Sequence, residues 1–134
     1  MLKKMISVAV LLFSTAVQAE TITHAYDTKK LCAQSATYFA KADVKQFYET
    51  LMPHWRLSID EIKNVVHQNN TLFKMHGERY GSYLGIDYME TDFAGTSIIE
   101  HTFFIKFDKK AVRYQCVFYK PKDHWIVNDI FWTS

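Results

Sequence analysis

Three segments of alternating apolar and polar residues near the end of the chain most constrain what it can fold into. They run over Thr96–Phe107, Ala111–Lys120 and His124–Thr133, with the short connections Asp108–Lys110 and Pro121–Asp123 between them. A period of two is typical of a β-strand with one buried face, because successive side chains point to opposite sides. Connections this short join antiparallel neighbours. The sequence therefore predicts three consecutive antiparallel strands.

The alternation also assigns the residues of these strands to two faces of the sheet. Pairing the strands through even-residue loops brings one nearly apolar set together, and we expect helices to cover it. This set contains His101, Phe103, Ile105, Phe107, Val112, Tyr114, Cys116, Phe118, Trp125, Val127, Asp129 and Phe131.

The opposite face mixes polar residues with a contiguous apolar patch. The patch consists of Phe104, Val117, Tyr119, Ile126, Ile130 and Trp132. Exposed patches of this kind usually mark an interface, so we expect a homodimer through the sheet. The alternative is that the first strand, the N-terminal arm or long Lys and Arg side chains cover part of the patch.

Helical spacing of apolar residues precedes the strands. One helix is expected from Asp27 to about Ala40, with Asp27 or Thr28 as its N-cap. A second helix should follow Asp43 and end before Pro53.

A third and longer helix is expected between Ser58 and Gly81. Ser58 and Glu61 fit a capping box at its start, and Gly81 suits the position just after its end. Its apolar stripe would be formed by Ile62, Val65, Val66, Leu72 and Phe73, with Asn69, His76 and Tyr80 on the same line. A first, less regular strand is expected over Leu84–Phe93.

The first 19 residues have the layout of a secretory signal peptide. Lys3 and Lys4 give a cationic start, an apolar run follows, and Val17–Ala19 supplies small residues for cleavage before Glu20. The apolar run is too short for a permanent membrane anchor. We therefore expect a periplasmic or secreted protein, with one domain over residues 20–134 and no transmembrane segment after cleavage.

Removal of the signal peptide would also remove the apparent basicity of the chain. The chain has 16 Lys and Arg residues and 14 Asp and Glu residues, and cleavage removes two lysines. A neutral domain without a basic cluster argues against nucleic acid as a partner.

The two cysteines, Cys32 and Cys116, are candidates for a disulfide in an oxidising compartment. Closing so long a loop would stabilise the fold by roughly 4 kcal/mol. The alternative is that both are buried free thiols that act as small apolar side chains.

The order of the elements and the sequence of the last hairpin resemble the nuclear transport factor 2-like superfamily. The hairpin segment is Val117–Asn128, with a Phe-Tyr-Lys-Pro turn followed by Trp125. The resemblance is to small exported bacterial members without an assigned activity. It implies an α+β cone fold, in which three N-terminal helices pack on a curved, mostly antiparallel four-stranded sheet. The superfamily includes isomerases, dehydratases, transport factors and binding domains, so the likeness implies no single function.

Three polar residues on the expected core face are candidates for chemistry: Asp129, His101 and Tyr114. A carboxylate among aromatic side chains could act as a general base, with the imidazole and the phenol as proton shuttle and oxyanion donor. The alternative is a purely structural role, because buried polar groups are usually just hydrogen-bonded. The histidine and cysteine spacings match no metal motif, and no cofactor is expected.

Two hypotheses for function follow. The first is a non-catalytic binding domain of the cell envelope, which takes a small apolar ligand or an envelope protein as partner. The second is a small isomerase- or dehydratase-like enzyme with a proton-transfer pocket at Asp129 and His101. An interior filled by Phe39, Phe73, Phe103 and Tyr114 would favour the first, and an open pocket the second.

Overall fold

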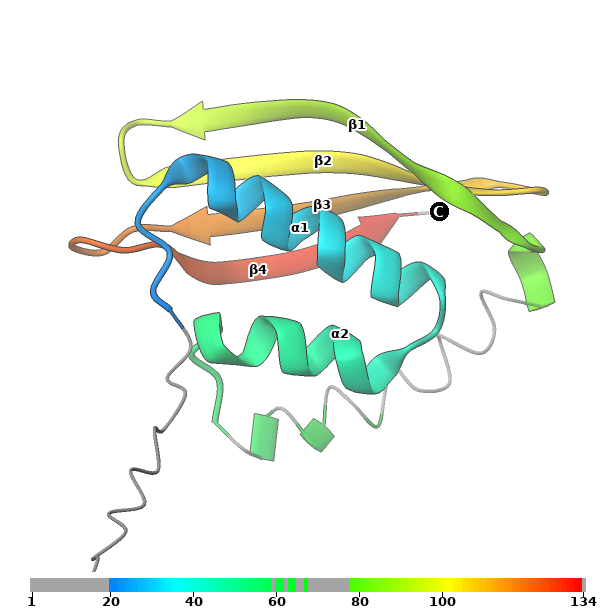
Figure 1. Ribbon diagram of the computed structural model, residues 1–134, viewed down its shortest axis with the longest axis horizontal. Coiled ribbons are helices and arrows are strands. Elements are labelled where there is room, and N and C mark those ends of the chain that lie inside the picture. The colour runs from blue at the N-terminus through cyan, green and yellow to red at the C-terminus, as the bar shows by residue number, and fades with distance from the viewer. Residues whose placement is uncertain (1–19, 59, 62, 65–66, 68–77, 134) are drawn as a thin grey trace, which may run out of the picture.

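The computed structural model describes residues 20–58, 60, 61, 63, 64, 67 and 78–133 of the chain. In this part an antiparallel sheet of four strands lies behind two helices (Figure 1). The helices are α1 (Ala25–Ala40) and α2 (Val44–Leu51), and a short 3-10 turn, η1 (Met52–His54), follows α2. The strands are β1 (Tyr83–Ala94), β2 (Ile98–Phe107), β3 (Ala111–Tyr119) and β4 (Ile126–Thr133), hydrogen-bonded in that order. The architecture is α+β, as expected.

The first helix begins earlier than the sequence predicts. Its N-cap is His24, whose side chain makes no capping hydrogen bond, so neither Asp27 nor Thr28 is the cap. Thr28 lies inside the helix, and its hydroxyl donates to the carbonyl of Ala25. The second helix starts as predicted, because the Asp43 carboxylate accepts a hydrogen bond from the backbone N–H of Gln46.

The predicted third helix lies partly outside the described residues. Its capping box is confirmed, since Ser58 N–H donates to Glu61 at 2.8 Å and Glu61 N–H donates to the Ser58 hydroxyl at 3.2 Å. Residues 78–80 are helical, and Gly81 follows with φ of +81°. Most of the predicted apolar stripe is not among the described residues, namely Ile62, Val65, Val66, Asn69, Leu72, Phe73 and His76.

Gly81 has a backbone conformation and a neighbour that both disfavour a side chain. A Cβ atom there would lie 1.5 Å from Asp108 Oδ1, which accepts the Ser82 N–H. We expect Gly81→Ala to lower the free energy of unfolding by about 2 kcal/mol, from backbone strain plus the displaced carboxylate. Gly95→Ala is the matched control, because Gly95 has φ of +62° with nothing within 4 Å of its added Cβ. Gly95→Ala should lower the free energy of unfolding by about 1 kcal/mol. If urea unfolding shows the same loss for Gly81→Ala and Gly95→Ala, the role of Asp108 is contradicted.

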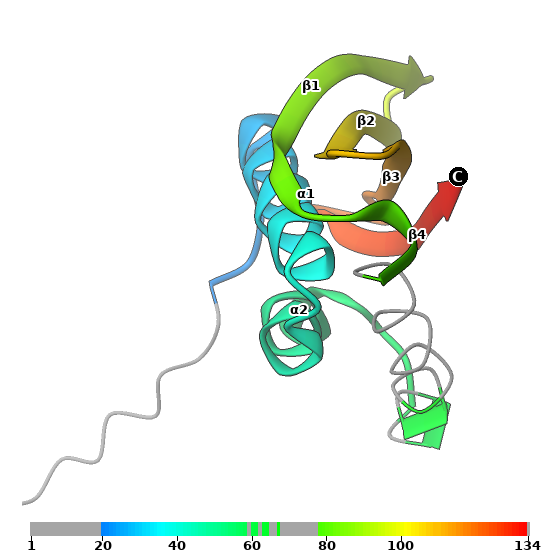
Figure 2. The same ribbon diagram turned by 90° about the vertical axis from the view of Figure 1, so that its right-hand side faces the viewer.

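The predicted faces of the sheet are correct for β2 and β3. His101 pairs with Cys116, Phe103 with Tyr114 and Ile105 with Val112, so the apolar sets of the two strands share a face. Both helices lie on that side of the sheet, and the sheet curls strongly when seen from its end (Figure 2). The core is therefore formed between α1, α2 and this face.

The predicted faces are wrong for most of β4. Val117 pairs with Asp129 but Phe118 pairs with Val127, so Asn128 is an extra residue in the ladder. Such a β-bulge reverses the orientation of every residue beyond it. Ile130 and Trp132 consequently face the core, while Asp129 and Phe131 are exposed on the other face.

Candidate functional site

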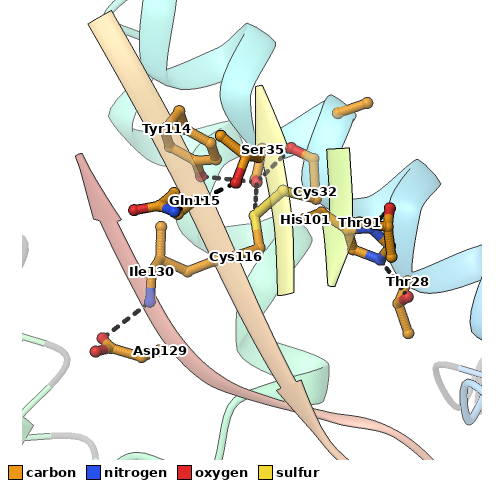
Figure 3. Close-up of a disulfide and its surroundings, with 12 residues drawn as sticks. Thr28, Cys32, Ser35, Thr91, His101, Tyr114, Gln115, Cys116, Asp129 and Ile130 are labelled. Carbon is orange, nitrogen blue, oxygen red and sulfur yellow. Dashed lines mark hydrogen bonds between the residues drawn. A yellow bond between two sulfur atoms is a disulfide. The ribbon is translucent and has the colours of Figure 1, made fainter. Parts of the chain in front are cut away.

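The centre of the core is held by a disulfide between α1 and β3. Cys32 and Cys116 are bonded at 2.04 Å and are fully buried, as the sequence analysis allowed (Figure 3). The Ser35 hydroxyl lies 3.9 Å from Cys116 Sγ and donates to the carbonyl of Cys32 at 2.8 Å. This cross-link ties the main helix to the middle of the sheet.

Tyr114, one of the three candidate catalytic residues, is sealed beside the disulfide. Its hydroxyl lies 2.7 Å from Ser35 Oγ. Since the Ser35 proton is donated to a carbonyl, the Tyr114 hydroxyl is the donor. Complete burial raises the pKa of Tyr114 far above its ordinary value, so the phenol stays neutral. It has a satisfied hydrogen bond and no access to a substrate.

His101, the second candidate, is 2% exposed and lies between two threonines. Its Nε2 is 2.7 Å from Thr28 Oγ1, and its Nδ1 is 2.8 Å from Thr91 Oγ1 (Figure 3). Because Thr28 donates to the Ala25 carbonyl, it must accept from Nε2–H. Nδ1 then accepts from Thr91, whose oxygen accepts from the Tyr88 hydroxyl at 2.7 Å. This chain of donors and acceptors fixes one neutral tautomer.

The electrostatics of His101 agree with this assignment. Burial, together with the nearby charge of Lys29, lowers the pKa of His101 to about 4. The imidazole is thus neutral at physiological pH, and both of its nitrogens are already used. Such a side chain is a structural link between α1, β1 and β2.

Asp129, the third candidate, does not face the core at all. The β4 bulge turns it to the exposed face, where its carboxylate accepts the N–H of Ile130 at 2.9 Å (Figure 3). The expectation of a desolvated general base at this position is therefore wrong. The structure does not bring the three candidates together.

The exposed patch predicted on the opposite face exists in altered form. Phe104, Val117 and Ile126 are half-buried there, and Tyr119 is 37% exposed. Ile130 and Trp132 leave this patch because they face the core, where Trp132 packs on Phe39 with ring centroids 4.6 Å apart. Phe131 takes their place on the surface.

An open apolar cleft of about 220 Å³, which sequence reasoning missed, lies between the first turn of α1 and the ends of β1 and β2. The Lys29 ammonium lies 3.5 Å from the centre of the Tyr88 ring. This contact joins α1 to β1 beside the cleft. The sequence contained a signal for one lining residue, Phe93. A turn at Gly95 pairs Phe93 with Ile99, which lies on the same face of the sheet as His101. The lining residues are Ala25, Tyr26, Lys29, Thr91, Phe93, Ile99 and His101.

A wider hollow of about 280 Å³ lies beside α1 and is rimmed by charges of both signs. Its lining residues include Glu20, Asp27, Lys30 and His54. Within the described residues, no group of three or more His, Cys, Asp and Glu side chains could hold a metal ion. A helix long and apolar enough to cross a membrane is also absent from the described part of the chain.

Comparison with known proteins bears on the fold. No protein-family model matches the chain, and no curated protein matches its sequence. A crystal structure of a candidate NTF2-like transpeptidase from Campylobacter jejuni is similar, with a TM-score of 0.57 and 15% sequence identity. The match covers 75% of this chain and 96% of that one. The chain therefore has the nuclear transport factor 2-like fold that its last hairpin and element order resemble.

Proposed function

We propose that this protein is an exported, non-catalytic binding domain of the cell envelope. The observation that carries the proposal is the separation of its polar candidates. Tyr114 is enclosed beside Ser35, His101 is held by two threonines, and Asp129 lies on the outer surface. A proton-transfer site needs such groups around one space that a substrate can enter.

The interior of the fold is occupied by side chains. Phe39 is 1% exposed, and its ring packs against Tyr114 at 5.5 Å and Phe47 at 6.1 Å between centroids. Phe103 is also buried, while Phe73 lies outside the described residues. This filling favours the binding hypothesis over an isomerase- or dehydratase-like enzyme.

The disulfide supports the exported location in this proposal. Disulfides between buried cysteines persist in oxidising compartments such as the periplasm and are rare in the cytosol. Residues 1–19, which have the layout of a signal peptide, lie outside the described residues. Export stays a proposal, with the periplasm or the medium as the destination.

Homodimerisation through the exposed sheet face is part of the proposal. Phe104, Val117, Tyr119 and Phe131 line that face and are flanked by ion pairs at the β1 side. A second copy placed there would remove these apolar side chains from water.

Native mass spectrometry of the exported protein, purified without reductant, tests the proposal. We expect a dimer with an intact disulfide and no small molecule in its interior. Tyr119→Glu should convert the dimer to a monomer, because it places a charge in the apolar patch. Tyr26→Glu, on the exposed surface of α1, is the control and should leave the dimer intact. A tightly held small molecule lost on Tyr114→Phe would instead favour the enzyme.

A further inference from the structure

The strand β1 is an edge of the sheet and carries an unusual share of exposed apolar side chains. Only β2 pairs with it, so one row of its backbone groups has no strand partner within the described residues. Its exposed large apolar residues are Leu84, Tyr88, Met89 and Phe93. Proteins usually protect such edges with charges, bulges or short strands, since an open edge is a template for pairing.

The first part of β1 is protected by bulges, whereas the last part has a regular register and carries only the acidic side chains of Glu90 and Asp92 as protection. Register shifts lie between Tyr83 and Gly85 and between Tyr88 and Glu90, which bend the strand. From Glu90 to Ala94 the pairing with β2 is regular, residue by residue. Figure 2 shows this end of β1 at the outer margin of the curled sheet. The segment Glu90–Ala94 is therefore a regular open edge.

The two faces beside this segment differ in chemistry. On the helix side lies the apolar cleft, walled by Tyr26 of α1 and by Phe93, which is 65% exposed. The polar atoms of Thr91 and His101 at the cleft are already hydrogen-bonded to each other and to their neighbours. The Lys29 ammonium, which also lines the cleft, lies over the Tyr88 ring, so the remaining walls favour an apolar ligand group.

The other side of the same segment is acidic. Asp92 pairs directly with Glu100 across the β1–β2 ladder, and like charges in this position repel. Glu100 accepts a hydrogen bond from the Gln115 amide at 2.7 Å, but neither carboxylate forms an ion pair within the described part of the chain. Glu90, next on this face, lies 3.9 Å from Arg113. A cation near Asp92 would relieve the repulsion.

We propose that Glu90–Ala94 of β1 binds an extended polypeptide of a partner protein as an added fifth strand. The strand would alternate apolar side chains, one of which fills the cleft, with basic side chains over Asp92 and Glu100. In strand addition, backbone hydrogen bonds supply affinity and alternate side chains supply specificity. This inference rests on the proposed binding function and names its partner class.

The charges of the site also select among possible occupants. Lys29 on the helix side repels basic side chains there and so fixes which face of the strand is apolar. A second copy of β1 would bring Asp87, Glu90 and Asp92 against the same carboxylates, which is unfavourable. A small apolar molecule would leave the open backbone edge unpaired.

A blocked heptapeptide, Lys-Val-Lys-Phe-Lys-Val-Lys, is the probe for this site. We expect it to shift backbone amide NMR resonances of Glu90–Ala94 and of the first turn of α1, with a dissociation constant obtained by titration. The same peptide with glutamate in place of lysine should bind at least about tenfold more weakly. Two N-methylated versions of the peptide test strand addition. In each version the backbone N–H groups along one edge of the extended peptide are methylated and cannot donate hydrogen bonds. Only one edge of an added strand faces β1, so only one version should lose binding.

Two variants map the site, and both alter exposed side chains. Phe93→Ala should weaken the lysine peptide about tenfold by removing a wall of the cleft. Asp92→Lys should reverse the preference, so that the glutamate peptide binds better than the lysine peptide. Met52→Ser, which changes an exposed apolar side chain of η1 that belongs to neither proposed surface, is the matched control and should change neither affinity.

Several outcomes would overturn the inference. Equal binding by both N-methylated peptides would exclude an added strand. A cleft that takes up benzene but not the peptide would make it a small-molecule site, and a dimer that is strengthened by Asp92→Lys would assign the edge to a second copy. The proposed function is judged separately, because an interior ligand that native mass spectrometry detects and that is lost on Tyr114→Phe contradicts it whether or not the peptide binds.

Discussion

Replacing both Cys32 and Cys116 with alanine should lower the free energy of unfolding by about 4 kcal/mol. The two residues are separated by 84 positions, so the bond closes most of the described domain into one loop. Cross-linking a loop of this length restricts the unfolded chain, and the restriction stabilises the folded state by roughly that amount. For a domain of this size the loss is a large part of the total stability, typically 5–15 kcal/mol. Urea unfolding at constant pH measures it.

Reduction provides the control for this prediction. Dithiothreitol should remove most of the stability difference between the wild-type protein and the double-alanine variant, and it should leave that variant unchanged. Because both cysteines are fully buried, alanine also removes some packing, which the reduced wild-type protein keeps. If oxidised and reduced wild type differ by less than about 1 kcal/mol, the chain-entropy argument fails for this domain.

The sequence predicted the β2–β3 pairing correctly because the register of this hairpin is uninterrupted. His101, Phe103 and Ile105 alternate with residues of the other face and meet Cys116, Tyr114 and Val112 across the ladder. One buried face then fixes the register, since a slip of one residue would expose all of these side chains. The same alternation placed Cys116 and Tyr114 in the core.

The sequence misplaced Asp129 because a β-bulge is not visible in alternation. Within β4 both readings leave a plausible pattern, with either Asp129 and Phe131 or Ile130 and Trp132 facing the core. The choice is made by the burial of Ile130 and by the contact of Trp132 with Phe39, which lies far away in the sequence. Long-range packing of this kind overrides a local period.

The cleft could not be predicted because it depends on where α1 begins and how it lies on the sheet. His24 has no side-chain capping bond, so no capping residue marks the start of the helix in the sequence. The two additional helical residues, Ala25 and Tyr26, lie at the ends of β1 and β2. The sequence could thus identify single residues such as Phe93, but it could not predict that residues of α1, β1 and β2 together form a cleft.

Acidification should destabilise the protein through His101. The pKa of this imidazole is about 4 in the folded protein, against 6.5 for an unperturbed histidine. Between these values the unfolded chain binds a proton that the folded protein does not, so stability falls as the pH decreases. The difference corresponds to a loss of about 3 kcal/mol from about pH 7.5 to about pH 4. Urea unfolding at a series of pH values measures this loss.

His101→Gln isolates this contribution from the other titrating groups. The pKa of His54 is also lowered by burial, but it titrates in both proteins and cancels in the comparison. The glutamine amide can donate toward Thr28 and accept from Thr91. The free energy of unfolding of the variant should therefore depend less on pH over this range than that of the wild type. His24→Gln, which changes an exposed histidine, should keep the full slope of the wild type.

The hydrogen bonds around His101 explain why no new interaction offsets the free-energy cost of burying the charged ring when it is protonated. Both nitrogens of an imidazolium are donors, so Thr91 would have to accept from Nδ1 and give up its own donation to the ring. Thr91 already accepts from Tyr88 in the neutral arrangement, so its contacts would need to be rearranged. A wild-type slope that persists in His101→Gln would contradict this account and assign the acid sensitivity to the surface carboxylates.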